Sequence, residues 1–382
     1  MKLQRLVLET FRNHQQTAID CSLGVNLFLG DNGEGKTNIL EGISYLCLSK
    51  SFFAANDTVV MNVDGNGFAI TGKFLSDGNI VYEVKVTFDK QQNQKNITVN
   101  KAKVDKASSF IGQFPVVVLS PEHSSITTGS PSDRRRFVDF VVSQSSRTYL
   151  DCLIDYRRIL KQRNKILSDM QFSHKENNSA LEPWNENLVR VGTVLIKIRL
   201  GFIEDFQNLM IDSYTTLSGN AEQPRITYFP SFECTADGKE AIETTFQDAL
   251  QDRSQEERRI GYSLVGPHRD DFMLQINKLD VRNFVSQGQH KTFLVALKLA
   301  EFFYLKKQCR ETPMLLLDDV LSEMDGHRSQ RLLETTAGLG QVFMTSTDER
   351  ALNWVPVVSS RPRKFFIRQG TIDRVEDAVH NN

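Results

Sequence analysis

The amino-acid sequence predicts an α/β protein in which a mixed-sheet lobe is interrupted by an inserted, mainly helical lobe. Three features of the chain support this prediction. A short apolar strand, Val25–Leu29, runs into a glycine-rich segment that leads into an amphipathic helix at Asn38–Leu48. A long helical pattern occupies the middle of the chain, from about Asp133 to Met210. The apolar strand Met314–Leu317 ends in two aspartates.

The N-terminal third is rich in predicted strands. Lys2–Leu8 alternates between polar and apolar residues, and the same alternation recurs at Phe68–Phe74, Ile80–Phe88 and Ile97–Val99. Val116–Leu119 is uninterrupted apolar sequence, which is typical of a strand buried on both faces.

The middle of the chain is mainly helical. Apolar residues recur every three or four positions in residues 133–167 and again in Trp184–Met210, with the polar segment Gln171–Pro183 between them. Arg225–Phe229 is a predicted strand, and Ala241–Arg259 is a predicted charged helix. We therefore expect a helical lobe II at residues 121–289.

Strand character returns at Tyr262–Val265 and Asp271–Ile276. A predicted helix at Lys291–Cys309 precedes the strand Met314–Leu317, and another strand is expected at Gln341–Met344. The prediction joins residues 290–382 to residues 1–120 as lobe I, which carries both the glycine-rich segment and the acidic strand.

The composition excludes several classes of protein. Lys and Arg number 46 and Asp and Glu number 47, so the net charge of -1 excludes a globally basic nucleic-acid binder, although not a local basic face. No apolar run is long enough to span a membrane, and the N-terminal stretch carries too many charges for a signal peptide. Five scattered cysteines without a CxxC pattern predict reduced thiols in a cytoplasmic protein, without disulfides or a zinc site.

The most specific motif follows Val25–Leu29 and fits the phosphate-loop pattern G-x-x-x-x-G-K-[ST]. Its glycines allow backbone N–H groups to surround a phosphate, and the helix N-terminus adds positive partial charge. Lys36 can reach the β- and γ-phosphate oxygens, and Thr37 can offer its hydroxyl to Mg²⁺. The predicted ATP-binding residues of this loop are Gly30, Asp31, Asn32, Gly33, Glu34, Gly35, Lys36, Thr37 and Asn38.

Two carboxylates end the strand Met314–Leu317. Strand ends beside a phosphate loop are where metal and water must be held. Asp318 is therefore predicted to hold Mg²⁺, directly or through water, and Asp319 to orient or deprotonate the attacking water. Lys36, Asp318 and Asp319 are candidate catalytic residues.

A second candidate phosphate element is Ser286–Lys291, which opens a helix and lies 32 residues ahead of Asp318. Ser and Gly at a helix start can bind an anion, but the same residues can simply cap the helix, so both interpretations stay open. Beyond the acidic strand, Asp325 supplies another acid at a turn.

These motifs, in this order, resemble the ATPase heads of the ABC superfamily. More narrowly, the chain resembles the RecF family of bacterial DNA-repair and replication-gap proteins, which is related to the SMC heads. The resemblance runs from Leu3 to about Asp373. Besides the motifs above it includes Phe11–His14, Ser120–His123, Gly129–Asp139 and Gly266–Asp271.

The resemblance implies a mechanism. ATP on the phosphate loop of one copy is also bound by the signature segment (Ser286–Gln289) of a second copy. Ser286, as a catalytic residue, then acts in trans together with Gly288 and Gln289, and Asp325 lies at the dimer seam. The ATP-joined homodimer clamps double-stranded or gapped DNA, and weak, DNA-stimulated ATP hydrolysis releases it. RecF-like proteins act with RecO and RecR to help the recombinase load.

The chain departs from the ABC pattern at several places. Asp319 stands where a Glu is usual, which is consistent with slow turnover. Glu122 stands near the position of the usual Gln, and Thr345–Asp348 replaces the usual switch His, so a hydroxyl is expected in the γ-phosphate region. Ser286 lies 249 positions after Thr37 without sustained heptads between them, which excludes a long coiled-coil arm.

Basic residues gather in the predicted helices. Asp133–Asp169 holds nine Lys or Arg and five Asp or Glu, and this excess predicts a face that follows DNA phosphates without reading sequence. A solvated, ion-paired helix face is the open alternative. The candidate DNA-binding residues are Arg157, Arg158, Lys161, Arg163 and Lys165.

Three further groups have open roles. Arg12, just after the first strand, is a candidate ATP ligand. Arg134–Arg136 can bind DNA or buttress the nucleotide site or the dimer seam. His268 and Arg269 can form a hydrogen-bonded turn or contact ATP.

Two other functions compete with this interpretation. The nucleotide-binding subunit of an ABC transporter is disfavoured by the 249-residue spacing and by Asp319. A scaffold with a vestigial ATP site is disfavoured because Lys36, Thr37, Asp318 and Ser286 are all intact.

Overall fold

The computed structural model describes residues 1–51, 56–62, 65–173, 178–219, 222–234, 238–321, 326–336, 338–348 and 362–377. The chain forms two compact units. Unit 1 consists of Met1–Ser124, Asp212–Glu222 and Ser286–Asn382, and unit 2 consists of Ser125–Ile211 and Gln223–Val285. The predicted lobes differ from these units by a few residues at each boundary and by the assignment of Asp212–Glu222.

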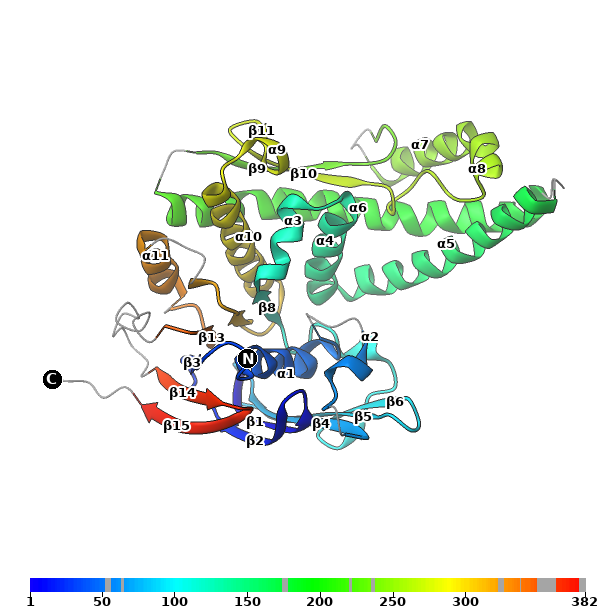
Figure 1. Ribbon diagram of the computed structural model, residues 1–382. Coiled ribbons are helices and arrows are strands. Elements are labelled where there is room, and N and C mark those ends of the chain that lie inside the picture. Colours follow the sequence, from blue (N-terminus) through cyan, green and yellow to red (C-terminus); the bar gives the residue numbers. More distant parts are fainter. Residues whose placement is uncertain are drawn as a thin grey trace. The chain divides into compact units, whose positions relative to one another are not determined.

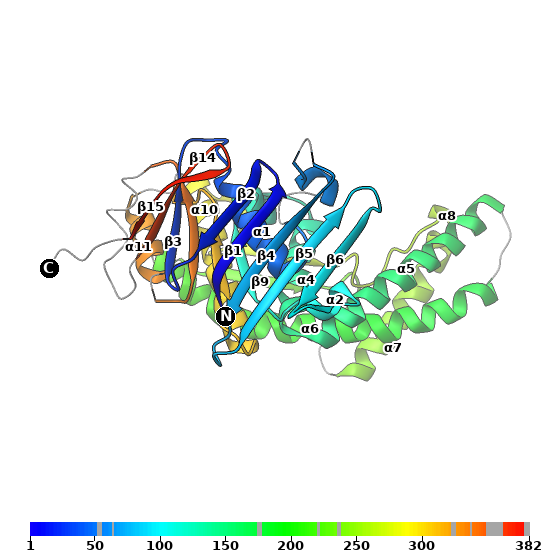
Figure 2. The ribbon, with the colours of Figure 1, turned by 90° about the horizontal axis from the view of Figure 1, so that it is seen from below.

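Unit 1 contains two six-stranded sheets and the helices that pack on them. Its elements are β1 (Lys2–Phe11), β2 (His14–Asp20), β3 (Val25–Leu29), α1 (Lys36–Leu48), η1 (Asp57–Val60), β4 (Gly67–Leu75), β5 (Val81–Asp89), β6 (Gln94–Val99), β7 (Ala102–Lys103), α2 (Ala107–Phe110), β8 (Val116–Leu119), η2 (Pro121–Ser124), α10 (Gln287–Gln308), β12 (Met314–Leu317), α11 (Gly326–Thr336), β13 (Val342–Ser346), β14 (Arg363–Arg368) and β15 (Thr371–Asp377). Figure 2 shows the antiparallel sheet, which has the order β2-β1-β4-β5-β6-β7. The other sheet has the order β15-β14-β3-β13-β12-β8 and is parallel except for β15.

Helix α1 packs between the two sheets of unit 1 (Figure 1). It contacts β1, β4 and β5 of the antiparallel sheet and β8 and β13 of the parallel sheet. Its buried residues therefore occur on all sides and include the charged Glu41. Helix α10 packs on β8, and the central strands β3 and β12 are buried along their whole length. Burial on both faces explains why these strands are uninterrupted apolar sequence.

A bulge explains the spacing of the apolar residues in β1. Leu3, Leu6 and Leu8 are buried, but three positions separate the first two where strict alternation requires two. The register between β1 and β4 shifts between Leu3 and Arg5, so one extra residue is accommodated there. The predicted strand is thus present.

Unit 2 is mainly helical. Its elements are α3 (Ser125–Thr128), α4 (Pro131–Ser145), α5 (Arg147–Ser173), all but the end of α6 (Asn178–Ser218), β9 (Pro224–Phe229), α7 (Lys239–Asp252), α8 (Ser254–Ile260), β10 (Asp271–Ile276), β11 (Leu279–Asp280) and α9 (Val281–Phe284). Helices α5 and α6 form a long helical hairpin (Figure 1), and β9, β10 and β11 form a small antiparallel sheet. Neither these long helices nor any other helix within the described ranges is apolar enough to cross a membrane.

The α/β fold with a mainly helical insert is confirmed, and two local predictions are corrected. The prediction of a strand at Tyr262–Val265 is wrong. Helix α8 ends at the left-handed Gly261, and the following segment is an irregular loop in which the buried Ser263 donates to Asn164 Oδ1 rather than to a neighbouring strand. The helical pattern in residues 133–167 covers two helices, α4 and α5, separated at Ser146. Strands β14 and β15 were not among the predicted elements.

Candidate functional site

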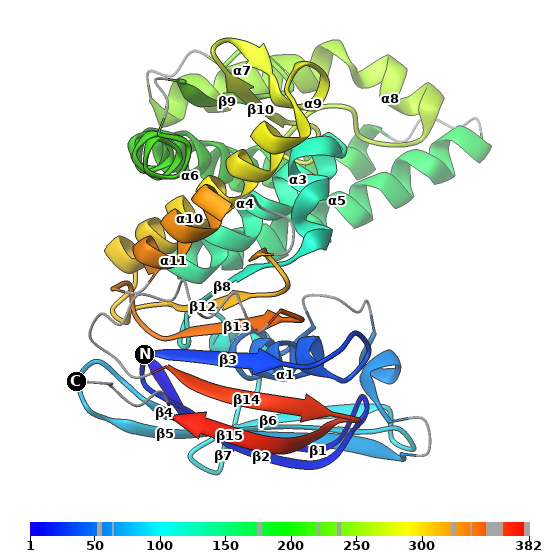
Figure 3. The ribbon, with the colours of Figure 1, turned by 60° about the vertical axis from the view of Figure 1, so that its left-hand side comes forward.

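The carboxyl ends of three parallel strands meet at one edge of the sheet in unit 1 (Figure 3). Strand β13 pairs with β3 on one side and with β12 on the other, with Met344 opposite both Leu27 and Leu317. The phosphate loop (Gly30–Thr37) follows β3, Asp318 follows β12, and Thr345 lies near the end of β13. The sheet therefore brings together segments that are far apart in sequence, as expected where parallel strands end.

The phosphate loop has the backbone of an anion site. Gly35 has a φ of 107° and is the N-cap of α1, which no side chain caps. A Cβ atom at Gly30 would lie 2.4 Å from the carbonyl oxygen of Ile367, so glycine is required there. The free N–H groups of the first turn and the helix dipole favour a negative ligand at this position.

Lys36 closes the phosphate loop. Its Nζ donates to the carbonyl oxygens of Gly30 at 2.8 Å and Asp31 at 2.7 Å. Burial lowers the pKa of the Lys36 ammonium, and the negative charges of Asp319 and Asp318 oppose that change. Because its partners are neutral carbonyls of its own loop, a phosphate oxygen can replace them with a stronger, charge-assisted bond.

Asp318 collects two hydroxyl groups. Thr37 Oγ1 and Thr345 Oγ1 each donate to Asp318 Oδ1 at 2.8 Å, and the Asp319 N–H donates to Thr345 Oγ1 at 2.8 Å. Burial raises the pKa of Asp318, and the hydrogen bonds from Thr345 and Thr37 oppose that shift. Thr345 thus links both acids, a role that its place in the sequence only hinted at.

A carboxylate and a hydroxyl are the oxygen ligands that suit Mg²⁺, which usually completes its shell with water and substrate phosphate. Thr37 and Asp318 fit this donor set. Within the described ranges no group of three or more His, Cys, Asp or Glu side chains could hold a metal. An ion held by Thr37 and Asp318 would complete its shell with water or phosphate oxygens.

The segment after β1 supports the phosphate loop from behind. Asn13 Nδ2 donates to the carbonyl of Glu34 at 3.0 Å, and Asn38 Nδ2 donates to Asn13 Oδ1 at 2.8 Å. His14 Nε2 lies 3.1 Å from the carbonyl oxygen of Gly35, to which it donates. Asn13 and His14 of the Phe11–His14 motif therefore position the loop.

A turn near the C-terminal end supports the same loop. The Gly370 N–H donates to the carbonyl of Glu34 at 2.9 Å, and the Gln369 N–H donates to the Glu34 carboxylate. Thr17 Oγ1 donates to the carbonyl of Gly370 at 2.9 Å. Gln369 and Glu34 are 335 positions apart, so no local sequence signal could reveal this contact.

Arg12 lies beside α1. Its Nε and Nη2 donate to the two oxygens of Glu41, each at 2.8 Å, and Nη1 donates to the carbonyl of Val59 at 3.0 Å. The bidentate ion pair with a buried carboxylate gives Arg12 a structural role. Its predicted role as an ATP ligand stays a prediction.

The signature segment begins helix α10. Ser286 is the N-cap and forms a capping box with Gln289, so the capped-helix interpretation is correct as a description of the structure. Ser286 itself is exposed, and its action on ATP in trans stays a prediction. The predicted seam residue Asp325 lies outside the described residues.

Two of the motifs bind each other inside unit 2. Arg134 Nε and Nη2 donate to both oxygens of Asp271 at 2.9 Å, and Arg135 Nη1 donates to the carbonyl of Asp270 at 2.6 Å. Only Arg136 is strongly exposed, beside Asp133. The motifs Gly129–Asp139 and Gly266–Asp271 thus hold the helical unit together, and Arg134 and Arg135 are not free to bind DNA.

A buried ion cluster lies behind these motifs. Arg199 is 2% exposed and donates to the carbonyl of Pro267 at 2.8 Å, to Tyr149 Oη at 3.0 Å and to Asp139 Oδ1 at 2.8 Å. Burial alone would lower the pKa of Arg199, but its anionic surroundings raise it well above the ordinary value. We name this set the Arg199 cluster; it comprises Asp139, Tyr149, Arg199, Tyr228 and Asp270.

His268 and Arg269 belong to the interior of unit 2. His268 Nδ1 lies 2.8 Å from Tyr156 Oη, and its Nε2 lies 3.2 Å from the carbonyl of Ser263. Burial lowers the pKa of His268 to about 4. Arg269 donates twice to the same carbonyl and stacks on Tyr262. The hydrogen-bonded turn is therefore the correct interpretation of this pair.

The candidate DNA-binding residues of α5 separate into two groups. Arg157, Arg158, Lys161 and Lys165 are exposed, although Arg157 pairs with Asp139 and Arg158 with Asp155. The prediction for Arg163 is corrected: its side chain is 3% exposed and its Nη2 binds Glu257 at 2.6 Å. DNA cannot reach it in this fold.

A sequence signal for the burial of Arg163 existed. Tyr156, Ile159, Leu167 and Met170 are buried at helical spacing on α5, and Arg163 falls on the same stripe. Its charge is satisfied there by Glu257, which only the folded unit supplies.

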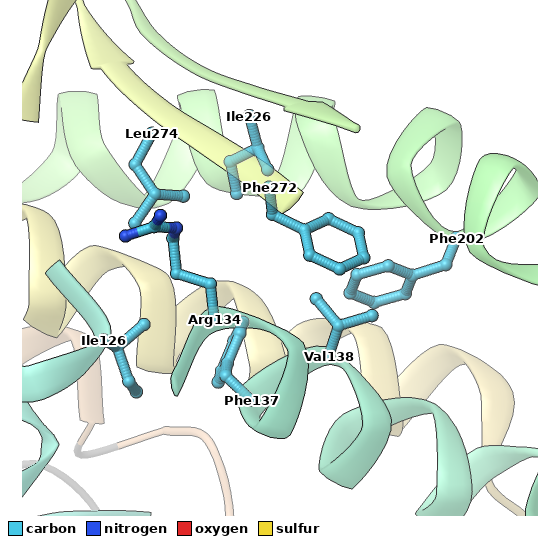
Figure 4. A pocket seen from close by; sticks show the side chains of 8 residues that line it. All are labelled: Ile126, Arg134, Phe137, Val138, Phe202, Ile226, Phe272 and Leu274. Carbon is cyan, nitrogen blue, oxygen red and sulfur yellow. The ribbon is translucent and has the colours of Figure 1, made fainter. Parts of the chain in front are cut away.

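A small cavity also lies within unit 2 (Figure 4). Arg134 and Phe137 of α4, Phe202 of α6, and Phe272 and Leu274 of β10 line part of it. Its volume of about 10 Å³ holds no more than one water molecule. It is therefore a packing defect of the core and too small for a ligand.

Comparisons with known proteins identify the family. The chain matches the family model described as RecF/RecN/SMC N terminal domain over residues 2–361. It is 37% identical to the DNA replication and repair protein RecF of Chloroherpeton thalassium over 355 residues, which cover 92% of this chain and 96% of that protein.

Solved structures agree. A structure of the recombination mediator protein RecF with ATP, in the RecFOR pathway, is 29% identical, has a TM-score of 0.88, and is matched over 99% of this chain and 98% of that chain. An Smc head bound to the C-winged helix domain of ScpA has a TM-score of 0.57 at 11% identity, covering 100% of this chain and 98% of that chain, and shares the fold alone. The chain therefore belongs to the RecF family of DNA replication and repair proteins.

Proposed function

We propose that the protein is an ATP-dependent DNA-binding protein of recombinational repair and replication-gap processing. The observation that carries the proposal is the cluster of Lys36, Thr37, Asp318 and Thr345 at the sheet edge, beside an uncapped helix N-terminus. This arrangement suits a nucleoside triphosphate with Mg²⁺. A family member of known structure binds ATP, which supports the assignment.

The roles of the residues follow from their chemistry. The loop N–H groups and the Lys36 ammonium neutralise the β- and γ-phosphates, and Thr37 and Asp318 hold Mg²⁺, which when bound withdraws charge from the phosphate oxygens. Asp319 orients the attacking water or accepts its proton. Its backbone N–H is fixed on Thr345, so the acid is held beside Asp318. The shorter acid makes hydrolysis slow.

A second copy completes the site. Ser286 and Gly288 of one protomer contact the γ-phosphate of ATP bound to the other, so ATP joins a homodimer. The dimer clamps double-stranded or gapped DNA, and hydrolysis releases it. Exposed basic residues on α5, Arg157, Arg158, Lys161 and Lys165, follow the DNA phosphates. Two features support this proposal: the cluster of polar groups at the sheet edge of unit 1 and the exposed Ser286 of the signature segment.

The relatives suggest the cellular role. Curated relatives are DNA replication and repair proteins, and the solved relative acts in the RecFOR pathway. We propose that this chain likewise helps a recombinase to load with RecO and RecR, in the cytoplasm where the bacterial chromosome lies. The ABC-transporter alternative is set aside because the chain belongs to the RecF family.

Sedimentation velocity with ATP, Mg²⁺ and duplex DNA tests the proposal. The wild-type protein should dimerise and retain DNA only with ATP. Lys36→Met should bind ATP roughly 100-fold more weakly, because a charge-assisted contact to phosphate is lost. Ser286→Arg should bind ATP normally and stay monomeric. A wild-type protein that remains monomeric with saturating ATP, Mg²⁺ and DNA would show that the proposal is wrong.

A further inference from the structure

The orientation of one amide group decides whether the signature segment is preorganised. Gln289 Oε1 accepts from the Ser286 N–H at 2.9 Å, and Ser286 Oγ accepts from the Gln289 N–H at 3.2 Å. This reciprocal pair works only if the side-chain oxygen of Gln289 faces Ser286. A flipped amide would place its NH₂ group against the Ser286 N–H, and two donors would face each other.

Glu222 selects that orientation. Gln289 Nε2 donates to Glu222 Oε1 at 2.8 Å, a charge-assisted bond that the flipped amide cannot make. The other oxygen of Glu222 accepts from Tyr214 Oη at 2.6 Å. Tyr214 is fully buried and packs edge-on against Phe293 of α10. Its fixed hydroxyl therefore restricts the position of the Glu222 carboxylate.

The same corner of unit 1 is braced from α11. Arg328 Nη1 donates to the carbonyl of Gly288 at 3.2 Å, and Arg331 Nη1 donates to the carbonyl of Leu217 at the end of α6 at 3.3 Å. The end of α6, the start of α10 and α11 thus converge on the signature segment.

We infer that Glu222 and Tyr214 are positioning residues for Ser286: they fix the Gln289 amide and thereby aim the Ser286 hydroxyl for its contact with ATP bound to a second copy. This inference rests on the proposed function. Because Ser286 Oγ accepts a hydrogen bond from the Gln289 N–H, its own hydrogen is free to donate to an anion outside the helix. An exposed serine without this support would sample other rotamers.

The test compares four variants by ATP-dependent dimerisation in sedimentation velocity. Glu222→Ala should weaken dimerisation about tenfold, because a symmetric dimer contains two signature segments and each loses a capping contact. Glu222→Gln should recover most of the loss, since its amide can accept from Gln289 and donate to Tyr214. Tyr214→Phe should have an intermediate effect. Asp212→Ala, an exposed acid in the same stretch, is the matched control.

Two further readouts separate positioning from stability. ATP binding by the monomer and the thermal midpoint without ATP should stay close to wild type in Glu222→Gln and Tyr214→Phe. In Glu222→Ala, kcat for ATP hydrolysis should fall while KM for ATP stays within about twofold, because the phosphate loop still binds the nucleotide.

Ser286→Arg separates the two possible failures. If Ser286→Arg blocks dimerisation but Glu222→Ala and Tyr214→Phe dimerise like the wild type, the positioning inference is wrong and the proposed function stands. If Glu222→Gln is as impaired as Glu222→Ala, the argument from amide orientation is wrong. If Ser286→Arg itself dimerises normally, the proposed trans contact fails, whatever the other variants do.

Discussion

The phosphate-loop site of unit 1 and the Arg199 cluster of unit 2 both hold charged groups away from water, but they satisfy those charges differently. Lys36 donates to neutral carbonyls of its own loop, and Asp318 accepts from two hydroxyls. Arg199 instead binds two carboxylates, a tyrosine and a carbonyl from other segments of unit 2.

The difference separates a binding site from a structural one. A charge held by neutral partners gains free energy when a charged ligand replaces them, so the phosphate loop can bind a polyphosphate. A charge already paired with fixed opposite charges has nothing to gain from a ligand, but removing one partner leaves the other buried and alone. The first kind of site should respond to mutation in activity, and the second in stability.

The largest expected effect tests the structural cluster. Arg199→Met leaves the buried carboxylate of Asp270 without its ion-pair partner and Asp139 with only the exposed Arg157, and it should lower the free energy of unfolding by about 3–5 kcal/mol. In a Trp354→Phe background, Trp184 of α6 is the only tryptophan, so its fluorescence during urea unfolding follows unit 2. The control Arg158→Ala removes an exposed ion pair and should cost no more than about 0.5 kcal/mol. Equal stability of the two variants would contradict the distinction.

A pH titration probes the same interior with a smaller effect. His268 has a folded pKa of about 4 and an ordinary value of 6.5, so below pH 6.5 the unfolded chain binds a proton that the folded chain rejects. Stability is unaffected above pH 6.5 and is lost as the pH falls toward 4, by about 2 kcal/mol between pH 7.5 and pH 5. His268→Gln should remove this part of the acid destabilisation in the same fluorescence assay. Parallel pH profiles of the two proteins would show that His268 titrates normally.

The binding site should respond in activity instead. Thr345→Val removes a donor to Asp318 and the acceptor of the Asp319 N–H. ATP hydrolysis should fall about tenfold, since the hydrogen bond to the Asp318 carboxylate and the one from the Asp319 backbone N–H are both lost, while the ATP affinity changes little. Thr347→Val, the same substitution at an exposed position two residues later, is the control. Unchanged hydrolysis in Thr345→Val would show that the two acids are positioned without this hydroxyl.

The smallest expected effect is on DNA binding, and it compares exposed basic residues of α5 with the buried Arg163 of the same helix. Lys161→Gln and Lys165→Gln, each an exposed change on α5, should each weaken duplex binding about threefold and reduce the salt slope by about 1. Fluorescence anisotropy at several salt concentrations measures both quantities. Lys239→Gln, at an exposed position of α7, is the charge-matched control. A salt slope that neither lysine changes would remove α5 from the proposed DNA face.

Much of the candidate site was predictable because its chemistry is local. The phosphate loop needs glycines, a lysine and a helix start in consecutive positions, and an acid at the end of an apolar strand is equally visible. The buried strands β3, β8 and β12 were recognisable from their apolar runs. The sheet then joins Thr37 to Asp318, as expected for parallel strands.

Other assignments needed the folded chain. The sequence does not show that Arg163 pairs with Glu257 or that Arg134 pairs with Asp271. It also does not show that the turn at Gly370 contacts the phosphate loop. The apolar stripe of α5 indicates that Arg163 is buried, but the carboxylate that pairs with it is fixed only by the packing of the folded unit.

The amino-acid sequence by itself determined the α/β class from the order of its predicted elements. It also located the phosphate loop, the acidic strand and the start of the helix at Ser286, since each of these depends on neighbours within one turn or one strand. Only the tertiary structure decided which charges are structural and which are available, and which distant side chains, such as Glu222 and Thr345, orient the site. Those choices depend on contacts between segments that lie tens to hundreds of residues apart in the sequence, and such contacts exist only after the chain has packed.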